Sequence, residues 1–406
     1  MKKLILIFIF IYQICVWPLF SQTKSPQQEI ETISIGTAYS DKSEVKLSEF
    51  ASDIEYIPLE SGTCILPDAS RSKIIYADKD YIHFSFGSDL DKAIYKFDKS
   101  GKLAGSFVNK GRNANEFIQI FDITAEEEGK LVAILDFMRI LVCTSDGQLI
   151  ANVNTSKILQ GYRMPMKIKV LDNNRLLFIC INRETHREHA IMVDFKGNLI
   201  ANTPVSDPIG IIKSSNRSQA ANAARMQYLN EQILLYNKGL KLLTEAEDYI
   251  YELDESMNTL PVYKLDWKKL RNTPARKAAE LNEAKYINNP AMECNSFLSF
   301  EIIFPAQTYP NMEINERIVK VVYDKRSKRT FTLKYHKDFG TSGFTNDIDS
   351  GMPFNPSFIF NNRMYQVVDA ANFIEYAKKS SSAKMKEIAA KLTDDSNSVI
   401  VAATLK

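Results

Sequence analysis

Apolar and polar residues alternate in short runs along most of the chain, and one local pattern returns several times. Residues 94–103, "IYKFDKSGKL", form a strand-like run, a polar turn that reaches Gly101, and the start of a second strand-like run. Equivalent stretches occur at 140–149 and 191–200, again with a glycine in the turn. Alternation with a period of two on both sides of a turn predicts a β-hairpin in each of these stretches.

The turn of this hairpin requires an unusual backbone conformation. Gly101 is expected to be left-handed, because glycine reaches positive φ without steric cost. A more divergent copy, "YIYELDESMNTL", carries Asn258 near the glycine's place, and a fifth copy follows around Asp324. Since asparagine tolerates positive φ better than most residues, we expect Asn258 to share the conformation of Gly101.

Each predicted hairpin follows another pair of strand-like runs, so the repeating unit contains about four strands and about six units fit the chain. A repeat of roughly 40 to 60 residues with four short strands is typical of a β-propeller blade. The predicted fold is therefore all-β, a six-bladed β-propeller of four-stranded blades over residues 45–406. A large β-sandwich is the alternative, and the regular period argues against it.

Both ends of the predicted propeller carry strand patterns that do not belong to a complete blade. The stretches are 45–60 and 397–406, and we expect both to complete the last blade and close the ring. Short helical insertions are expected at about 266–293 and before the closing strand within 382–405, and 207–225 is a polar insertion. Such insertions project from a face of the fold, where ligands are often bound.

The first 21 residues have a different pattern. Lys2 and Lys3 precede an almost entirely apolar run from Leu4 to Phe20, and the small residue Ser21 follows. This is the pattern of a secretory signal peptide cleaved near Ser21. It predicts an extracytoplasmic protein, periplasmic or secreted, with residues 22–44 as a linker; a retained membrane anchor is the alternative.

Net charge and the position of Cys15 limit the kinds of partner and membrane attachment that we expect. The chain has 51 Lys and Arg against 49 Asp and Glu, and loss of Lys2 and Lys3 with the signal peptide would leave it neutral. Net charge therefore gives no case for a nucleic-acid partner, and we expect no transmembrane segment in the mature chain. Lipid attachment at Cys15 is not expected, because Gln13 and Ile14 stand where small residues usually precede a lipidated cysteine.

The remaining cysteines are well separated in the sequence. Cys143 and Cys180 lie inside apolar runs and are predicted to be buried core residues. Cys64 and Cys294 lie in predicted loops and could pair in an oxidising compartment, a point that the sequence leaves open. No C-x-x-C pair occurs, which argues against a zinc knuckle.

Four stretches resemble a known family. They are "VKLSEFASDIEYIPLE", "FDKSGKLAGSFVNKGRNANEF", "GFTNDIDSGMPFNP" and "NSVIVAATLK". Together they resemble the six-bladed β-propellers that are abundant among secreted and lipid-anchored proteins of Bacteroidetes. That family has no established common activity, so the resemblance implies the fold and leaves the function open.

Two motifs of this resemblance supply candidate ligand-binding residues. The first is the loop "GRNANEF", where Arg112 and Glu116 match the family's glycine-rich loop while Asn113 to Asn115 replace Gly-Pro-Gly. Arg112 and Glu116 could bind a polar ligand at the propeller's funnel. The interpretation that we favour is that they pair with each other or cap the loop backbone between the first two blades.

The second motif is "NDIDSGMPFNP", which contributes Asn346, Asp347 and Asp349. Alternating oxygen side chains are typical of calcium loops, but the further acidic or amide ligand and the distal Glu of such a loop are not evident. We therefore expect a structural turn without a metal or other cofactor, although calcium at Asp347 and Asp349 is the alternative.

Catalytic signatures are absent from the sequence. No G-x-S-x-G, H-E-x-x-H or P-loop stretch occurs, and His186 and His189 lie in a charged hairpin tip without a third ligand at a suitable spacing. The leading hypothesis is a non-enzymatic binding or scaffold protein that holds a protein or glycan partner of the cell envelope on one face. The alternative is a funnel enzyme such as a polysaccharide lyase or a lactonase-like hydrolase.

Overall fold

The computed structural model describes most of the chain from residue 30 to residue 406. The exceptions within that range are residues 42, 63–72, 79, 86–92, 166, 173, 206–231, 244–247, 255, 272–284, 287–290, 305–310 and 312–313. The predicted signal peptide, the polar insertion at 207–225, Cys64 and the centre of the predicted helical insertion lie outside the described residues.

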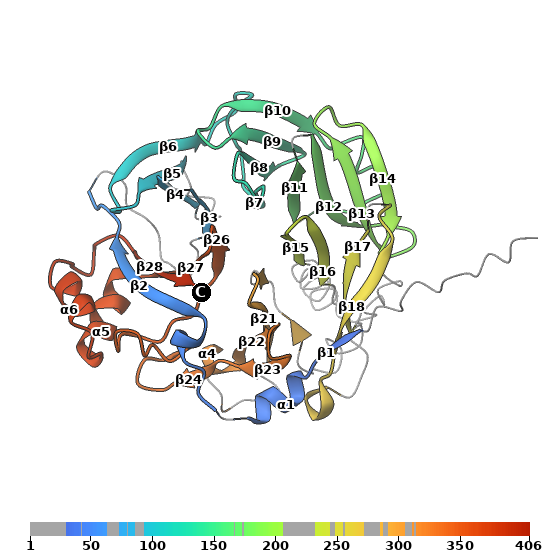
Figure 1. Cartoon of the computed structure of the whole chain (residues 1–406). Helices are drawn as coiled ribbons and strands as arrows, with labels where there is room; N and C mark the ends of the chain where they lie inside the picture. The colour runs from blue at the N-terminus through green and yellow to red at the C-terminus, as the bar shows by residue number, and fades with distance from the viewer. Residues whose placement is uncertain are drawn as a thin grey trace, which may run out of the picture.

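Six antiparallel sheets stand around a common axis, and their outermost strands run along the circumference (Figure 1). Blade 1 contains β3 (Lys73–Ala77), β4 (Tyr81–Ser85), β5 (Ala93–Asp98) and β6 (Leu103–Asn109). Blade 2 contains β7 (Asp122–Ala125), β8 (Leu131–Asp136), β9 (Arg139–Thr144) and β10 (Leu149–Asn154). Blade 3 contains β11 (Ile168–Asp172), β12 (Arg175–Ile181), β13 (Glu188–Asp194) and β14 (Leu199–Pro204).

The remaining blades depart from this regular plan. Blade 4 contains β15 (Gln232–Tyr236), β16 (Gly239–Leu243), β17 (Tyr249–Leu253) and β18 (Thr259–Leu265), with β1 (Glu31–Ile33) added in parallel along the outer edge of β18. Blade 5 contains β19 (Lys285–Tyr286), β20 (Met292–Glu293), β21 (Phe297–Ile303), β22 (Ile318–Asp324) and β23 (Arg329–Thr332). Beside it, β24 (Lys334–His336) and β25 (Thr341–Gly343) form a separate two-stranded sheet.

Blade 6 closes the ring with strands from both ends of the described chain. It contains β26 (Phe358–Phe360), β27 (Arg363–Val368), β28 (Val399–Leu405) and, outermost, β2 (Ala51–Pro58). The register between β2 and β28 runs from Ala51 opposite Leu405 to Pro58 opposite Val399. The predicted six-bladed propeller and its closure by both terminal runs are thus confirmed.

Short helices cover part of the rim. They are α1 (Ile35–Ser40), η1 (Leu47–Glu49), η3 (Lys268–Leu270), α4 (Ile314–Arg317), α5 (Ala370–Lys379) and α6 (Ala383–Ala389). Helix α1 and strand β1 occupy the stretch that the sequence pattern assigned to a linker. Helix α5, which the sequence analysis did not anticipate, joins α6 in the connection between β27 and β28 (Figure 1).

The core is divided among the junctions between neighbouring blades. Each of six apolar clusters joins residues of two adjacent sheets, and one of them packs Ile57 and Tyr365 of blade 6 against Phe84 and Phe97 of blade 1. A single blade could not bury both of its faces, so the sheets stabilise one another around the ring.

The hairpin turns confirm one expectation about the repeated pattern and correct another. Gly101 is left-handed, with φ of 89°. The expectation for Asn258 is wrong, because the positive φ of 65° belongs to its neighbour Met257. Met257 donates its N–H to the carbonyl of Asp254, just as Gly101 donates to that of Asp98. The buried Met257 side chain, 3% exposed, packs in the apolar cluster between blades 3 and 4, which offsets the strained backbone.

Candidate functional site

A buried carboxylate organises the tip of blade 2, where β8 turns into β9. Asp136 is fully buried and accepts hydrogen bonds from the backbone N–H groups of Gln119 and Phe137, both at 2.8 Å, and of Ile118 at 3.1 Å. Its second oxygen accepts from Nε of Arg139 at 2.8 Å. One side chain therefore fixes the hairpin tip to the loop that arrives from blade 1.

Arg112 and Glu116 lie on that same loop. The Glu116 carboxylate accepts from the backbone N–H of Asn113 at 3.0 Å, and this bond lowers the pKa of Glu116. The Glu116 carbonyl accepts from the Arg139 guanidinium at 2.7 Å. Glu116 thus caps the loop and connects it to the tip, while the Arg112 side chain remains exposed beside it.

Three large apolar side chains are exposed on this rigid support. Phe137 is 56% exposed, Ile118 45% and Met138 37%. Met138 has φ of 61°, a backbone conformation that residues other than glycine and asparagine rarely adopt. This tip was not predicted from the sequence. The turn "DFMR" nevertheless gives a signal, since two large apolar residues stand where polar turn residues are usual.

The late motif lies at the ring closure, where Asp349 connects three segments of the chain. Its carboxylate accepts from the Tyr56 hydroxyl of β2 at 3.1 Å and from the Ser382 hydroxyl at 2.6 Å. It also accepts from the Asn346 amide at 2.8 Å and from the backbone N–H of Gly351 at 3.1 Å. Ser382 in turn accepts from the N–H of Met385 and caps α6.

Asp347 makes a second connection in this motif. Its carboxylate accepts from the backbone N–H of Ser48 at 2.9 Å and from the Ser48 hydroxyl at 2.6 Å. Burial acts to raise the pKa of Asp347, but the two bonds from Ser48 outweigh it and lower the pKa. The oxygens of Asp347 and Asp349 therefore face N–H and O–H donors. Within the described residues, no group of three or more His, Cys, Asp or Glu side chains could hold a metal.

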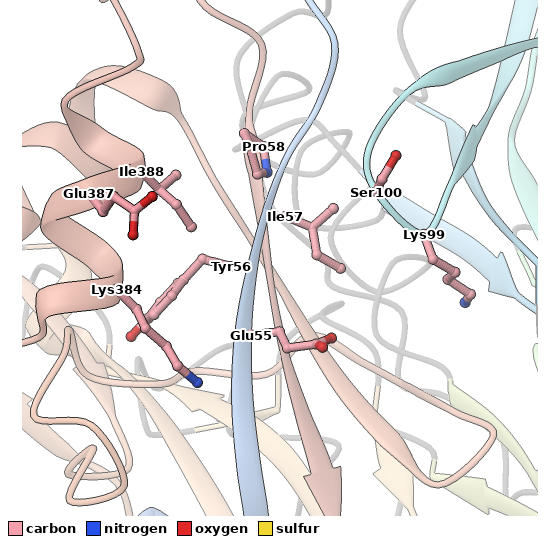
Figure 2. Close-up of a pocket in the computed structure, with 9 residues that line it drawn as sticks. All are labelled: Glu55, Tyr56, Ile57, Pro58, Lys99, Ser100, Lys384, Glu387 and Ile388. Carbon is pink, nitrogen blue, oxygen red and sulfur yellow. The ribbon is translucent and has the colours of Figure 1, made fainter.

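A groove of about 380 Å³ lies outside the ring closure, between β2, the first-blade turn and α6 (Figure 2). Ile57 and Pro58 line it together with Lys99, Lys384 and the carboxylates of Glu55 and Glu387. Glu55 pairs with Arg363, and Glu387 pairs with Lys391 at 2.8 Å. Burial lowers the pKa of the Lys99 ammonium. The groove is polar, and both of its carboxylates already have cationic partners within the chain.

The described cysteines and two of the histidines lie within the blades. Cys143, Cys180 and Cys294 are buried, so the first two are the core residues that the sequence predicted. His83 is 1% exposed in blade 1, and His189 bonds Asn202 across two strands of blade 3. No helix in the described ranges is long and apolar enough to cross a bilayer.

Fold and surface together define this protein as a six-bladed β-propeller with an apolar, loop-supported tip on its second blade. The chain belongs to the family described as domain of unknown function DUF4934, whose model matches residues 30–404.

The solved structures add a relative of the same shape. The crystal structure of a "putative exported protein" from Bacteroides fragilis is 12% identical, with a TM-score of 0.66, over 93% of this chain and 100% of that one. A virginiamycin B lyase from Staphylococcus aureus aligns at 12% identity over 70% of this chain and 74% of its own, with a TM-score of only 0.37. No curated protein matches the chain.

Proposed function

We propose that this protein is a non-catalytic binding protein that acts outside the cytoplasm and holds a protein partner on the tip of blade 2. The observation that carries the proposal is the exposure of Phe137, Met138 and Ile118 on a tip that the buried Asp136 holds in place. Exposed apolar groups gathered at one point of a surface are typical of interaction sites.

Burial of the apolar side chains of this tip would stabilise a complex with a partner. Burying a fully exposed phenylalanine or isoleucine side chain contributes roughly 1.5–3 kcal/mol, and about half of the surface of Phe137 and of Ile118 is still available for burial. Because the hydrogen bonds to Asp136 already fix the backbone of the tip, little further ordering is needed on binding, and that lowers the cost of association. The exposed Arg112 beside the tip adds a residue type that is enriched in binding hot spots.

The composition of the tip favours a protein over a glycan. Sugar rings stack mainly on aromatic faces, whereas here Phe137 stands beside the aliphatic Ile118 and the flexible Met138. Methionine adapts its shape to different partners and is frequent on protein-binding surfaces. For Asn346, Asp347 and Asp349 we propose a positioning role at the ring closure, away from the partner.

The proposed location rests on the first residues of the sequence. Lys2 and Lys3 followed by the apolar run 4–20 have the pattern of an export signal. Fractionation of cells that express the full chain tests the location directly. Recovery of the intact, uncleaved chain in the cytoplasm would contradict it.

The binding proposal is tested by capture from envelope extract. Purified protein is compared with Phe137→Ser and with Leu260→Ser, a control whose side chain is 47% exposed on blade 4. We expect one partner to be retained by the parent and the control and lost with Phe137→Ser. Equal capture by all three would overturn the assignment of the tip. Selective binding on a glycan array would replace the protein partner with a sugar, and turnover of a sugar or peptide would overturn the non-catalytic function.

A further inference from the structure

The tip of blade 2 lies among the connections at one end of blades 2 and 3. Because both sheets are antiparallel, every second connection lies at this end. The segments concerned, called the upper loops below, are 110–121, 137–138, 155–167 and 182–187. The backbone N–H of Thr155 donates to the Met138 carbonyl at 3.0 Å, and that of Arg183 donates to the Gly161 carbonyl at 2.9 Å. These bonds connect the tip to the third upper loop and the third to the fourth.

The upper loops are rich in basic residues. They contain seven Lys and Arg against two Asp and Glu. The connections at the other end of the same two blades are 126–130, 145–148, 173–174 and 195–198. These contain two Lys and Arg against four Asp and Glu. The two ends of blades 2 and 3 therefore carry opposite charge, and the end with the apolar tip is the positive one.

Three cations of the upper loops are available to a partner. Arg112, Lys157 and Arg183 are exposed, and none of them forms an ion pair with a described carboxylate. Arg183 also lies close enough to Arg163 to lower the pKa of that guanidinium, after the larger effect of burial. Cations gathered in this way create a positive potential that attracts an anionic group.

The acidic residues at this end offset little of the positive charge. Those at the adjoining strand ends are buried, namely Asp122, Asp136 and Glu188. The Glu116 carboxylate accepts from the backbone N–H of Asn113 within its own loop. Glu184 remains as the exposed carboxylate of the upper loops. The apolar tip therefore lies in a region of net positive charge.

We propose that the partner held by the tip is an acidic protein, which contacts Phe137 with apolar residues and faces the upper loops with Asp and Glu. This inference rests on the function proposed above and specifies the chemistry of the partner. Arginine pairs with a carboxylate through two parallel hydrogen bonds, so the upper loops would orient the partner as well as attract it. Charges around an interface act mainly on the rate of association, whereas buried apolar contacts act mainly on dissociation.

The test uses the protein that the parent retains and Phe137→Ser loses, purified as the probe for surface plasmon resonance. Rate constants are measured between about 0.05 and about 0.5 M NaCl, a range over which salt increasingly screens charge. We expect the association rate constant to fall at least about tenfold across this range. Phe137→Ser should instead raise the dissociation rate constant, because it removes the central apolar contact.

Two triple variants with the same change in net charge separate the two ends of the blades. The first combines Arg112→Glu, Lys157→Glu and Arg183→Glu in the upper loops. The matched control combines Lys130→Glu, Arg175→Glu and Lys196→Glu at the other end of the same blades. The first should lower the association rate constant about tenfold or more, and the control should leave it within about twofold. Equal melting temperatures show that both variants keep the fold.

Each other outcome overturns the acidic partner. If neither salt nor the first triple variant changes association, the inference fails while the proposed function stands. Faster association of that variant would show a basic partner, and equal effects of the two variants would show a response to net charge alone. If the parent retains no protein, the inference fails together with the function. Cosedimentation with phosphatidylglycerol vesicles that Phe137→Ser abolishes would make an anionic membrane the occupant of the tip.

Discussion

The same hairpin turn occurs at the junction that closes the ring and at the junction between blades 2 and 3. The two turns differ in how closely they pack against the neighbouring blade. A Cβ on Gly101 would lie 2.1 Å from the carbonyl oxygen of Pro58, whereas a Cβ on Gly197 would find its nearest neighbour, a methyl of Val153, at 3.6 Å. Both glycines are left-handed, with φ of 89° and 84°. The turn conformation is thus common to the repeat. The close approach occurs at the closure and again at the junction of blades 1 and 2, where a Cβ on Gly147 would lie 2.3 Å from the carbonyl oxygen of Phe107, but it is absent at Gly197.

The largest expected effect comes from removing the closing strand. β28 lies between β27 and β2 in blade 6, so truncation of Asn397 to Lys406 separates β2 from its sheet as well as deleting a strand. We expect loss of cooperative unfolding, measured by thermal melting followed by circular dichroism. A truncated chain that melts within a few degrees of the parent would show that the other blade junctions hold the ring without closure.

The two glycines provide the next test. Gly101→Ala and Gly197→Ala share the cost of a left-handed alanine, about 1–2 kcal/mol. Only Gly101→Ala must also displace the Pro58 carbonyl, and overpacking of that kind adds roughly 1–3 kcal/mol. Chemical denaturation should therefore show a larger loss of unfolding free energy for Gly101→Ala. Equal losses would mean that the turn at the closure is packed no more tightly than the turn between blades 2 and 3.

A pH titration tests the buried histidine of blade 1. His83 lies between the rings of Tyr76 and Phe107. Both of its ring nitrogens are buried without a hydrogen bond, and an oxygen of the Asp78 carboxylate lies 3.7 Å from Nε2. Burial lowers its pKa from 6.5 to about 4 against the opposing effect of Asp78, and the charges of Lys96 and Lys99 lower it further.

Because the unfolded chain takes up this proton first, the contribution of His83 to stability is complete above pH 6.5 and falls as the pH drops towards 4. The loss should reach roughly 2 kcal/mol by pH 5. His83→Leu should remove that part of the pH dependence. If the stability of the variant still falls by the same amount between pH 6.5 and 4, that loss comes from other groups.

The smallest expected effect is at the polar cluster of the closure. Tyr56→Phe removes one of the four hydrogen-bond donors to Asp349 but keeps the ring that packs on Phe373. A bond to a carboxylate contributes about 1.5–3 kcal/mol, and the remaining donors should limit the loss to the lower end of that range. Denaturation of the variant measures it. An unchanged free energy of unfolding would show that the hydrogen bonds from Asn346, Gly351 and Ser382 suffice for the Asp349 carboxylate.

The fold was predictable from the sequence because the hairpin turn is a local signal. Asp98 accepts from the backbone N–H of Ser100 and of Lys102 within the turn, so five consecutive residues specify it. Met257 was missed because the gain that offsets its strained backbone comes from burial against blade 3, which no local pattern reveals. The exposed tip was missed for a similar reason. Asp136 looked like an ordinary strand end, and its role depends on donors 17 and 18 residues earlier in the sequence.

The pairing of β2 with β28 also sets the order of events when the molecule folds. Its partners, such as Pro58 and Val399, come from opposite ends of the described chain, so the ring cannot close until the last strand has been synthesised. Contacts between such distant residues form slowly, since a long loop must be closed first. Until then the apolar faces of blades 6 and 1 cannot bury one another. We expect the nascent chain to depend on chaperones in this interval and the finished ring to open slowly.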